Sequence, residues 1–162
     1  MSAAISAKLL PKLDKPVDLN RKFRGRRILG DHKTFRGLIS GSLVGTIIYV
    51  AQIFFYSRFN FIQEISFFDY SQSFLLIGLI MGFGALFGDM VKSFFKRQLD
   101  FKPGQSWFFF DQVDWLIGSL ILSWPFTKVS ITIILLTIAI GVISHVIVKF
   151  LGFVFKLDKE PI

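Results

Sequence analysis

Three carboxylates lie where hydrophobic stretches of the chain end. Asp89 directly follows 18 residues without a charge, and Asp111 and Asp114 stand just before a short apolar run. Residues three apart share one face of a helix, so Asp111 and Asp114 are expected side by side. Ionisable groups at the level of a membrane are energetically costly and usually mark function. Since a short segment joins Asp89 to the other two, we expect all three to meet at one membrane face.

A row of cations accompanies Asp89. If the helix continues past this residue, an arc of about 140° on its surface holds one acid, one hydroxyl and three cations. Clustered carboxylates repel one another, and a hard cation such as Mg²⁺ relieves that repulsion while also binding substrate phosphates. The neighbouring cations suit phosphate oxygens, so the pattern predicts metal-assisted phosphoryl or nucleotidyl transfer at the membrane surface. A solvated helix face would explain the cations alone equally well. The residues of this arc are Asp89, Lys92, Ser93, Lys96 and Arg97.

Two other interpretations of the acids remain open. Carboxylates within membrane spans also serve as proton relays in transporters, although these acids stand at the edge of a span beside cations. A small proton- or cation-coupled transporter would move ions without consuming a nucleotide. A non-catalytic membrane assembly protein, held together by its glycine-rich helix faces, would tolerate the loss of any single acid.

A second basic cluster, from residue 24 to residue 37, precedes the first apolar run. Asp31 or Thr34 is predicted to cap the following helix, whose amino end can bind phosphate with the help of Lys33 and Arg36. The segment lacks the glycine spacing of a Walker phosphate-binding loop. Anchoring the membrane topology explains its charge equally well.

The elements that position these residues are predicted to be membrane-spanning helices. The chain has 162 residues, 52% of them hydrophobic, and it contains no cysteine. This composition excludes disulfide scaffolds, cysteine-based zinc sites and thiol nucleophiles. Uncharged runs of 18 to 20 residues, long enough to cross a bilayer, cover 38–57, 71–88 and 129–148. A fourth run, 115–127, can span only if it extends back to Trp107 and so includes two of the acids.

Charge predicts how the spans are oriented. The net charge is +8, and 17 of the 19 Lys and Arg residues fall on one side of the membrane if the amino terminus is cytoplasmic. The positive-inside rule favours this orientation. We therefore predict an all-α integral membrane protein of the cell (plasma) membrane, with about four transmembrane helices and a polar site facing the cytoplasm. Its parts are a basic cytoplasmic segment (1–37), a transmembrane catalytic domain (38–150) with a cytoplasmic loop (89–114), and a cytoplasmic tail (151–162).

The expected partners follow from this organisation. The lipid bilayer surrounds the spans, and the basic charge is assigned to topology and phosphate binding, with no nucleic acid partner. Glycines recur every fourth residue at 37, 41 and 45, at 78 and 82, and at 84 and 88. Such spacing lets helices approach closely, either within one chain or between copies in a homo-oligomer.

Two extended motifs stand in order along the chain. The upstream motif, from 25 to 37, is Gly-Arg-Arg-Ile-Leu-Gly-Asp-x-Lys-Thr-x-Arg-Gly. The second reads Gly88-Asp89-x-x-Lys92-Ser93-Phe-x-Lys96-Arg97, then Lys102-Pro103-Gly104-x-x-Trp107-x-x-x-Asp111-Gln112-x-Asp114. Together they resemble the CDP-archaeol synthase family, the short branch of the CDP-alcohol cytidylyltransferases that also include the CDP-diacylglycerol synthases.

Two departures from the wider family are informative. The diacylglycerol enzymes carry His-Gly-Gly before the paired acids, where this chain has Phe-Phe-Phe at 108–110; the difference favours the short branch. The family usually has a further hydrophobic span ahead of the upstream motif. We therefore expect either that this chain lacks that helix or that the complete protein starts further upstream.

The resemblance implies a reaction in which CTP and 2,3-bis-O-geranylgeranylglyceryl phosphate give CDP-archaeol and pyrophosphate, with Mg²⁺ as cofactor. Phosphatidate, the substrate of a CDP-diacylglycerol synthase, is the alternative acceptor. The implied metal ligands are Asp89, Asp111 and Asp114, which together with Lys96 form the implied catalytic set. The implied CTP- and phosphate-binding residues are Lys33, Thr34, Arg36, Lys92, Ser93, Lys96, Arg97 and Lys102.

Overall fold

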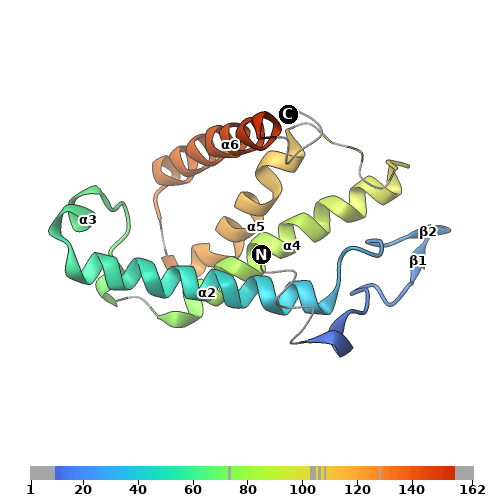
Figure 1. The fold of residues 1–162 in the computed structure, drawn as a ribbon, viewed down its shortest axis with the longest axis horizontal. Helices are drawn as coiled ribbons and strands as arrows, with labels where there is room; N and C mark the ends of the chain where they lie inside the picture. Colours follow the sequence, from blue (N-terminus) through green and yellow to red (C-terminus); the bar gives the residue numbers. More distant parts are fainter. Residues whose placement is uncertain are drawn as a thin grey trace.

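The computed structural model describes residues 10–72, 74–102, 105, 107, 109–127 and 129–155 (Figure 1). The fold is mostly helical, as predicted. Its body consists of α2 (Phe35–Arg58), α4 (Leu75–Gln98), α5 (Phe110–Thr127) and α6 (Ile131–Val154). The shorter elements are η1 (Pro11–Leu13), α3 (Asn60–Ile65), η2 (Tyr70–Gln72) and an antiparallel hairpin of β1 (Lys22–Phe23) and β2 (Arg26–Arg27).

Helices α2, α4 and α6 are long and apolar enough to cross a membrane. Each has 24 residues, and the rise of a helix makes such a segment about 36 Å long, more than the hydrocarbon core of a bilayer. Many of their large apolar side chains are exposed, among them Ile47, Phe54 and Leu135. Exposed apolar surface of this extent is typical of a face that contacts lipid. Helix α5 is shorter, with 18 residues, and carries its two acids near its start.

The start of α2 and the course of α4 match the local sequence signals. Thr34 caps α2, because its hydroxyl accepts a hydrogen bond of 3.1 Å from the Gly37 N–H. Helix α4 continues past residue 88, where the uncharged run ends, as far as Gln98. The row of charges that begins at Asp89 therefore lies on one continuous helix, as expected.

The other boundaries near the site differ from the sequence prediction. Helix α5 begins at Phe110 rather than Trp107, although the Asp111 N–H donates a hydrogen bond to the Trp107 carbonyl. The sequence also predicts a helix-breaking turn at Pro103–Gly104, which lies outside the described residues; α4 ends before it, at Gln98. The chain leaves α4 at Leu99, and Asp100 follows with φ of +61°.

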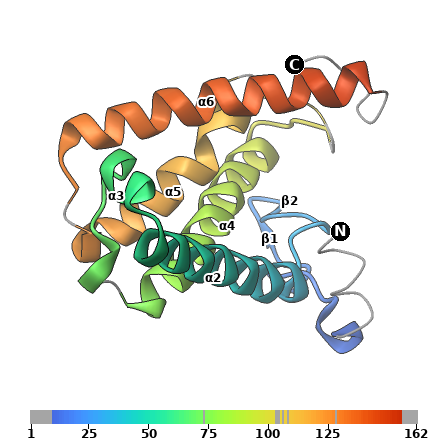
Figure 2. The same ribbon diagram turned by 60° about the vertical axis from the view of Figure 1, so that its left-hand side comes forward.

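The four long helices pack in the order α2, α4, α5, α6, so that α4 and α5 form the centre (Figure 2). Glycines bring the backbones together, as their spacing predicted. A Cβ atom on Gly45 would lie 2.8 Å from the Cα of Gly82, and one on Gly84 would lie 2.9 Å from the Cα of Ser119. Gly37 is different, because a Cβ there would meet only Thr34 among the described residues. Close packing thus holds α4 against both α2 and α5.

The segment before α2 lies beside the carboxyl end of α4 (Figure 2). Arg26, on β2, donates to the Gln98 carbonyl and forms an ion pair with Asp100. This contact joins the amino-terminal segment to the end of α4, where the row of charges lies.

Candidate functional site

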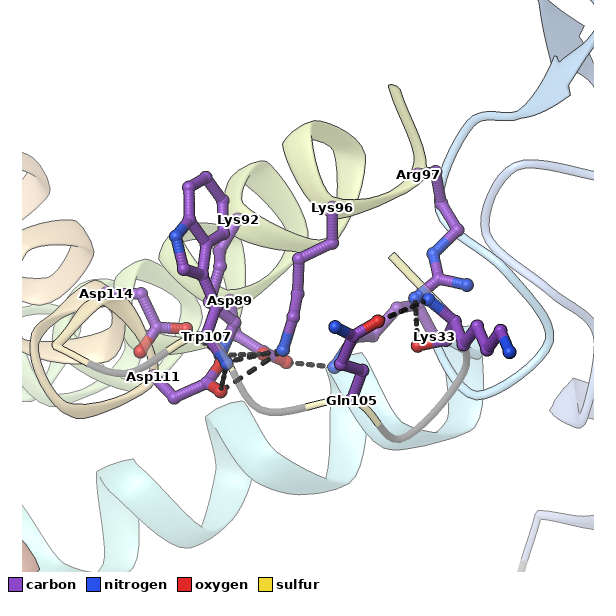
Figure 3. Close-up of polar contacts among 10 residues, drawn as sticks. Lys33, Asp89, Lys92, Lys96, Arg97, Gln105, Trp107, Asp111 and Asp114 are labelled. Carbon is purple, nitrogen blue, oxygen red and sulfur yellow. Dashed lines mark hydrogen bonds and ion pairs between the residues drawn. The ribbon is translucent and has the colours of Figure 1, made fainter. Parts of the chain in front are cut away.

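The Lys92 ammonium lies among the three carboxylates that the sequence singled out. Its Nζ is 2.8 Å from an oxygen of Asp111, 2.8 Å from Asp114 and 3.3 Å from Asp89. Helix α4 supplies Asp89 and Lys92, and the first turns of α5 supply the other two. The structure therefore brings the three acids to one place at the ends of two helices (Figure 3).

The close packing of α4 against α5 allows this meeting. A Cβ atom on Gly88 would overlap the carbonyl oxygen of Asp114, and one on Gly118 would overlap the carbonyl oxygen of Gly84. Only glycines let the two backbones come this near. As a result, one lysine side chain can reach acids on both helices.

Asp111 is the most extensively bound of the three acids. Both of its oxygens lie 3.1 Å from the Lys96 Nζ, and the Trp107 N–H donates to it over 2.6 Å (Figure 3). With Lys92, these contacts place two ammonium groups and one backbone donor around a single carboxylate. Charge-assisted hydrogen bonds of this kind hold a side chain in one orientation.

Lys33 brings the upstream motif to the same place, because its ammonium forms an ion pair with Asp89. Of the other two predicted phosphate-binding residues of that motif, Thr34 lines a small neighbouring pocket together with Lys33 and Asp89, whereas Arg36 is not among the described residues that line it. Thr34 is engaged in capping α2, and Arg36 forms an ion pair of 2.9 Å with Asp14. The motif therefore contributes one of its three predicted residues to the cluster around the acids.

A polar pocket of about 310 Å³ opens between the upstream motif and α4. Five cations and two acids line it, a balance that suits a polyanion such as a nucleotide triphosphate. Of the predicted phosphate-binding residues, it takes in Lys33 and four from α4, whereas Thr34, Arg36 and Lys102 are not among the described residues that line it. The lining residues are Arg27, Leu29, Gly30, Asp31, His32, Lys33, Asp89, Lys92, Ser93, Lys96 and Arg97.

An apolar groove of about 240 Å³ lies on the other side of Lys92, between α4 and α5. Lys92 and Asp114 are the charged residues among the described groups that line it, and Phe87, Phe95 and Ile121 are typical of the rest. Lys92 lines both this groove and the polar pocket. The two cavities therefore meet at one ammonium group.

The three carboxylates fit a hard cation by their chemistry, since Mg²⁺ takes oxygen ligands. In the described part of the chain, however, no three acidic or histidine side chains already form a metal site, because Lys92 stands among them. Asp114 Oδ2 is buried, and it lies 2.8 Å from the Lys92 Nζ. A cation could therefore be held by these acids if the lysine moved aside.

Two residues near the polar pocket were not singled out from the sequence. Arg27, on β2, lines the pocket, but in the sequence it is one cation in a basic run. The buried Asp18 contacts Arg27 at 3.0 Å. The one available signal for Asp18 was that an acid stands in a segment that is otherwise dominated by Lys and Arg.

Comparisons with known proteins agree on one family. The CarS-like family model, described as CDP-archaeol synthase, matches residues 2–161. A CDP-archaeol synthase of Methanoregula boonei is 35% identical over 153 residues, covering 90% of this chain and 88% of the relative. One from Methanosarcina barkeri is 38% identical over 157 residues, covering 91% and 90%.

A solved structure is also similar. It is described as an intramembrane enzyme for archaeal membrane lipid biosynthesis, and it shares 25% identity with this chain at a TM-score of 0.62. The match covers 91% of this chain and 88% of the other. With the three long apolar helices, this similarity shows a multi-pass membrane protein.

Proposed function

The chain belongs to the CDP-archaeol synthase family, and we propose that it transfers the cytidylyl group of CTP to the phosphate of a membrane lipid. The lipid is 2,3-bis-O-geranylgeranylglyceryl phosphate, and the products are CDP-archaeol and pyrophosphate.

The observation that carries this proposal is the meeting of the two cavities at Lys92. A lipid phosphate has an apolar chain and an anionic head, which need an apolar groove that ends at a cation. A nucleotide triphosphate needs a polar pocket rich in cations. A reaction between the two substrates requires that these sites share a boundary, and Lys92 lies at that boundary.

The bond changes require no nucleophile from the protein. An oxygen of the lipid phosphate attacks the α-phosphorus of CTP, the new P–O–P bond forms, and the bond to the β-phosphate breaks to release pyrophosphate. Lys92 orients the lipid phosphate from the boundary of the groove. Lys33, Lys96 and Arg97 stabilise the negative charge that develops on the departing pyrophosphate.

Asp89, Asp111 and Asp114 would hold Mg²⁺, which polarises phosphoryl oxygens and neutralises their charge when bound. Lys92 lies within 3.3 Å of each of these acids and balances part of their charge. The polar end of the bundle faces the cytoplasm, because 17 of 19 basic residues then lie inside.

The test is pyrophosphate release by the purified protein in detergent with Mg²⁺. CTP is compared with ATP, and the geranylgeranyl lipid phosphate is compared with phosphatidate. Release should require CTP and the geranylgeranyl lipid. Faster release with phosphatidate would instead identify a CDP-diacylglycerol synthase, and ion flux into vesicles without CTP consumption would identify a transporter.

Asp111→Asn should lower the rate by at least about 100-fold, because it removes charge at the centre of the polar contacts. The matched control is Asp69→Asn. Asp69 also accepts hydrogen bonds, from Tyr56 and Ser71, but it lies at the other end of α2. Thermal unfolding of both variants should remain close to that of the wild type, and an Asp111→Asn variant that keeps its activity would contradict the assignment.

A further inference from the structure

Asp18 is a buried acid outside the polar pocket, with no exposed side-chain surface. Its Oδ1 accepts hydrogen bonds from the Asn20 N–H and from Arg27, both at 3.0 Å. Its Oδ2 accepts from the N–H of Leu29 at 3.0 Å, from the N–H of Gly30 at 3.2 Å and from the Arg27 Nε at 3.3 Å. One carboxylate thus organises three separate parts of the amino-terminal segment.

The partners of Asp18 form one wall of the polar pocket. Arg27, Leu29 and Gly30 all line the pocket, whereas Asp18 does not. Gly30 has φ of +100°, a conformation that glycine adopts readily and other residues rarely do. The guanidinium of Arg27 also contacts Asp31 at 2.8 Å, so two carboxylates fix its orientation.

The backbone around Asp18 connects this wall to the acids on α4. The Val17 N–H donates to the Lys33 carbonyl over 2.7 Å, and the Phe35 N–H donates to the Lys15 carbonyl over 3.0 Å. These bonds pair the segment before Asp18 with the end of the upstream motif. Since Lys33 forms an ion pair with Asp89, a short series of contacts connects this wall to the three acids.

We propose that Asp18 is a positioning residue for nucleotide binding, which holds the Arg27 guanidinium and the Leu29–Gly30 backbone in place to receive the phosphates of CTP. The inference rests on the proposed function. Hydrogen-bond donors that are already ordered lose little conformational entropy when the ligand binds. If Asp18 is removed, the nucleotide itself must order Arg27 and the turn at Gly30. This ordering lowers the affinity for CTP.

The charge state of Asp18 supports this role. Burial raises the pKa of the carboxyl. The Arg27 hydrogen bond and three backbone N–H groups together lower this pKa by more than burial raises it, and the resulting pKa is about 2. Asp18 is therefore ionised at every pH at which the enzyme would work. A neutral amide at this position would accept fewer hydrogen bonds and would carry no charge to hold Arg27.

The test is Asp18→Asn, with the rate measured as a function of CTP concentration. We expect the KM for CTP to rise about tenfold, the effect of weakening one charge-assisted hydrogen bond, while kcat stays within about threefold of the wild type. A purely structural role predicts another pattern. It would lower the fraction of folded enzyme, and so kcat, with KM unchanged, and that result would overturn the inference.

A double-mutant cycle tests whether Asp18 acts through Arg27. In an Arg27→Gln background, Asp18→Asn should raise KM by clearly less than it does alone, because the two residues serve one contact. Fully additive effects would contradict the inference. Asp69→Asn is the matched control and should leave the KM for CTP unchanged.

Two outcomes separate this inference from the proposed function. A wild-type enzyme without CTP-dependent pyrophosphate release would overturn both, whereas an active wild type with an unchanged KM in Asp18→Asn would overturn the inference alone. If Asp18→Asn does not fold, as judged by gel filtration in detergent, Arg27→Gln takes its place. That variant should raise the KM for CTP, and an unchanged KM would refute the role of this wall.

Discussion

Helices α4 and α6 both pack against α5, but they approach it in different ways. At the α4–α5 interface, backbone meets backbone, because Cβ atoms on Gly84, Gly88 or Gly118 would run into main-chain atoms of the facing helix. At the α5–α6 interface, the three described atoms nearest to a Cβ on Gly141 all belong to the Leu116 side chain. A leucine side chain can change its rotamer, whereas a helix backbone cannot yield locally.

The difference corresponds to what each interface positions. The α4–α5 interface holds acids from two helices around Lys92, which requires accuracy on the scale of a hydrogen bond. Helix α6 has no buried residue among those described, and most of its large apolar side chains are exposed. Its placement depends more on the surrounding lipid than on precise packing. Tight glycine packing therefore occurs where the reacting groups must meet.

Among changes that test this comparison, the largest effect is expected for Gly88→Ala, which puts a methyl group against the Asp114 carbonyl. The helices must separate, and the acids on α4 and α5 must move apart. Displacement of reacting groups by about 1 Å can cost 100-fold in rate, so we expect a loss of that order in kcat/KM. Pyrophosphate release measures it, and a variant with normal activity would refute the role given to this interface.

Lys92→Met should have the next largest effect. It removes the ammonium that lies within 3.3 Å of three carboxylates and at the boundary of both cavities. We expect the rate to fall about 10- to 100-fold, because a charge-assisted contact to the reacting phosphate is lost. The KM values for CTP and for the lipid should both change, in contrast to Asp18→Asn, which should alter only the former.

The matched control for Lys92→Met is Arg58→Met. Arg58 is also a cation near the end of a long helix, but it lies over the Phe54 ring at 5.7 Å and away from both cavities. Activity should be unchanged in this variant. Equal losses in the two variants would indicate a general effect of membrane-edge cations rather than a role at the boundary.

The smallest effect is expected for Gly141→Ala, the counterpart of Gly88→Ala. Leu116 can turn away from the added methyl group, so the free energy of unfolding should fall by about 1 kcal/mol, the lower end of the cost of an added methyl group in a packed interface. Pyrophosphate release should remain within about threefold of the wild type. A loss of pyrophosphate release as large as that of Gly88→Ala would show that the α5–α6 interface is as rigid as the α4–α5 interface.

Local features of the fold were predictable because they depend on neighbours in sequence. Uncharged runs predicted the long helices, and Asp31 or Thr34 was predicted to cap α2, of which Thr34 is the cap. The helical spacing of Asp89, Lys92 and Lys96 placed them on one face. Glycine spacing predicted close helix contacts but not which helices would meet, since the pattern contains no information about the partner.

The candidate site was only partly predictable for the same reason. The resemblance implied Thr34 and Arg36 as phosphate-binding residues, and this remains a prediction; the sequence did not show that Thr34 also caps α2 or that Arg36 pairs with Asp14. Asp18 carried no motif at all. Its importance depends on contacts with residues 9 to 12 positions away, which no periodic pattern reveals.

The sequence by itself determined the membrane-spanning character, the helix positions, the clustering of charge at one end and the family, because each follows from hydrophobicity, local spacing or contiguous motifs. The tertiary structure alone decided that Lys92 lies among acids from two helices, that the polar pocket and the apolar groove meet there, and that Asp18 supports the pocket wall. These features depend on how closely α4 approaches α5 and on how the amino-terminal segment folds back, and such distances arise only when segments far apart in the chain pack together.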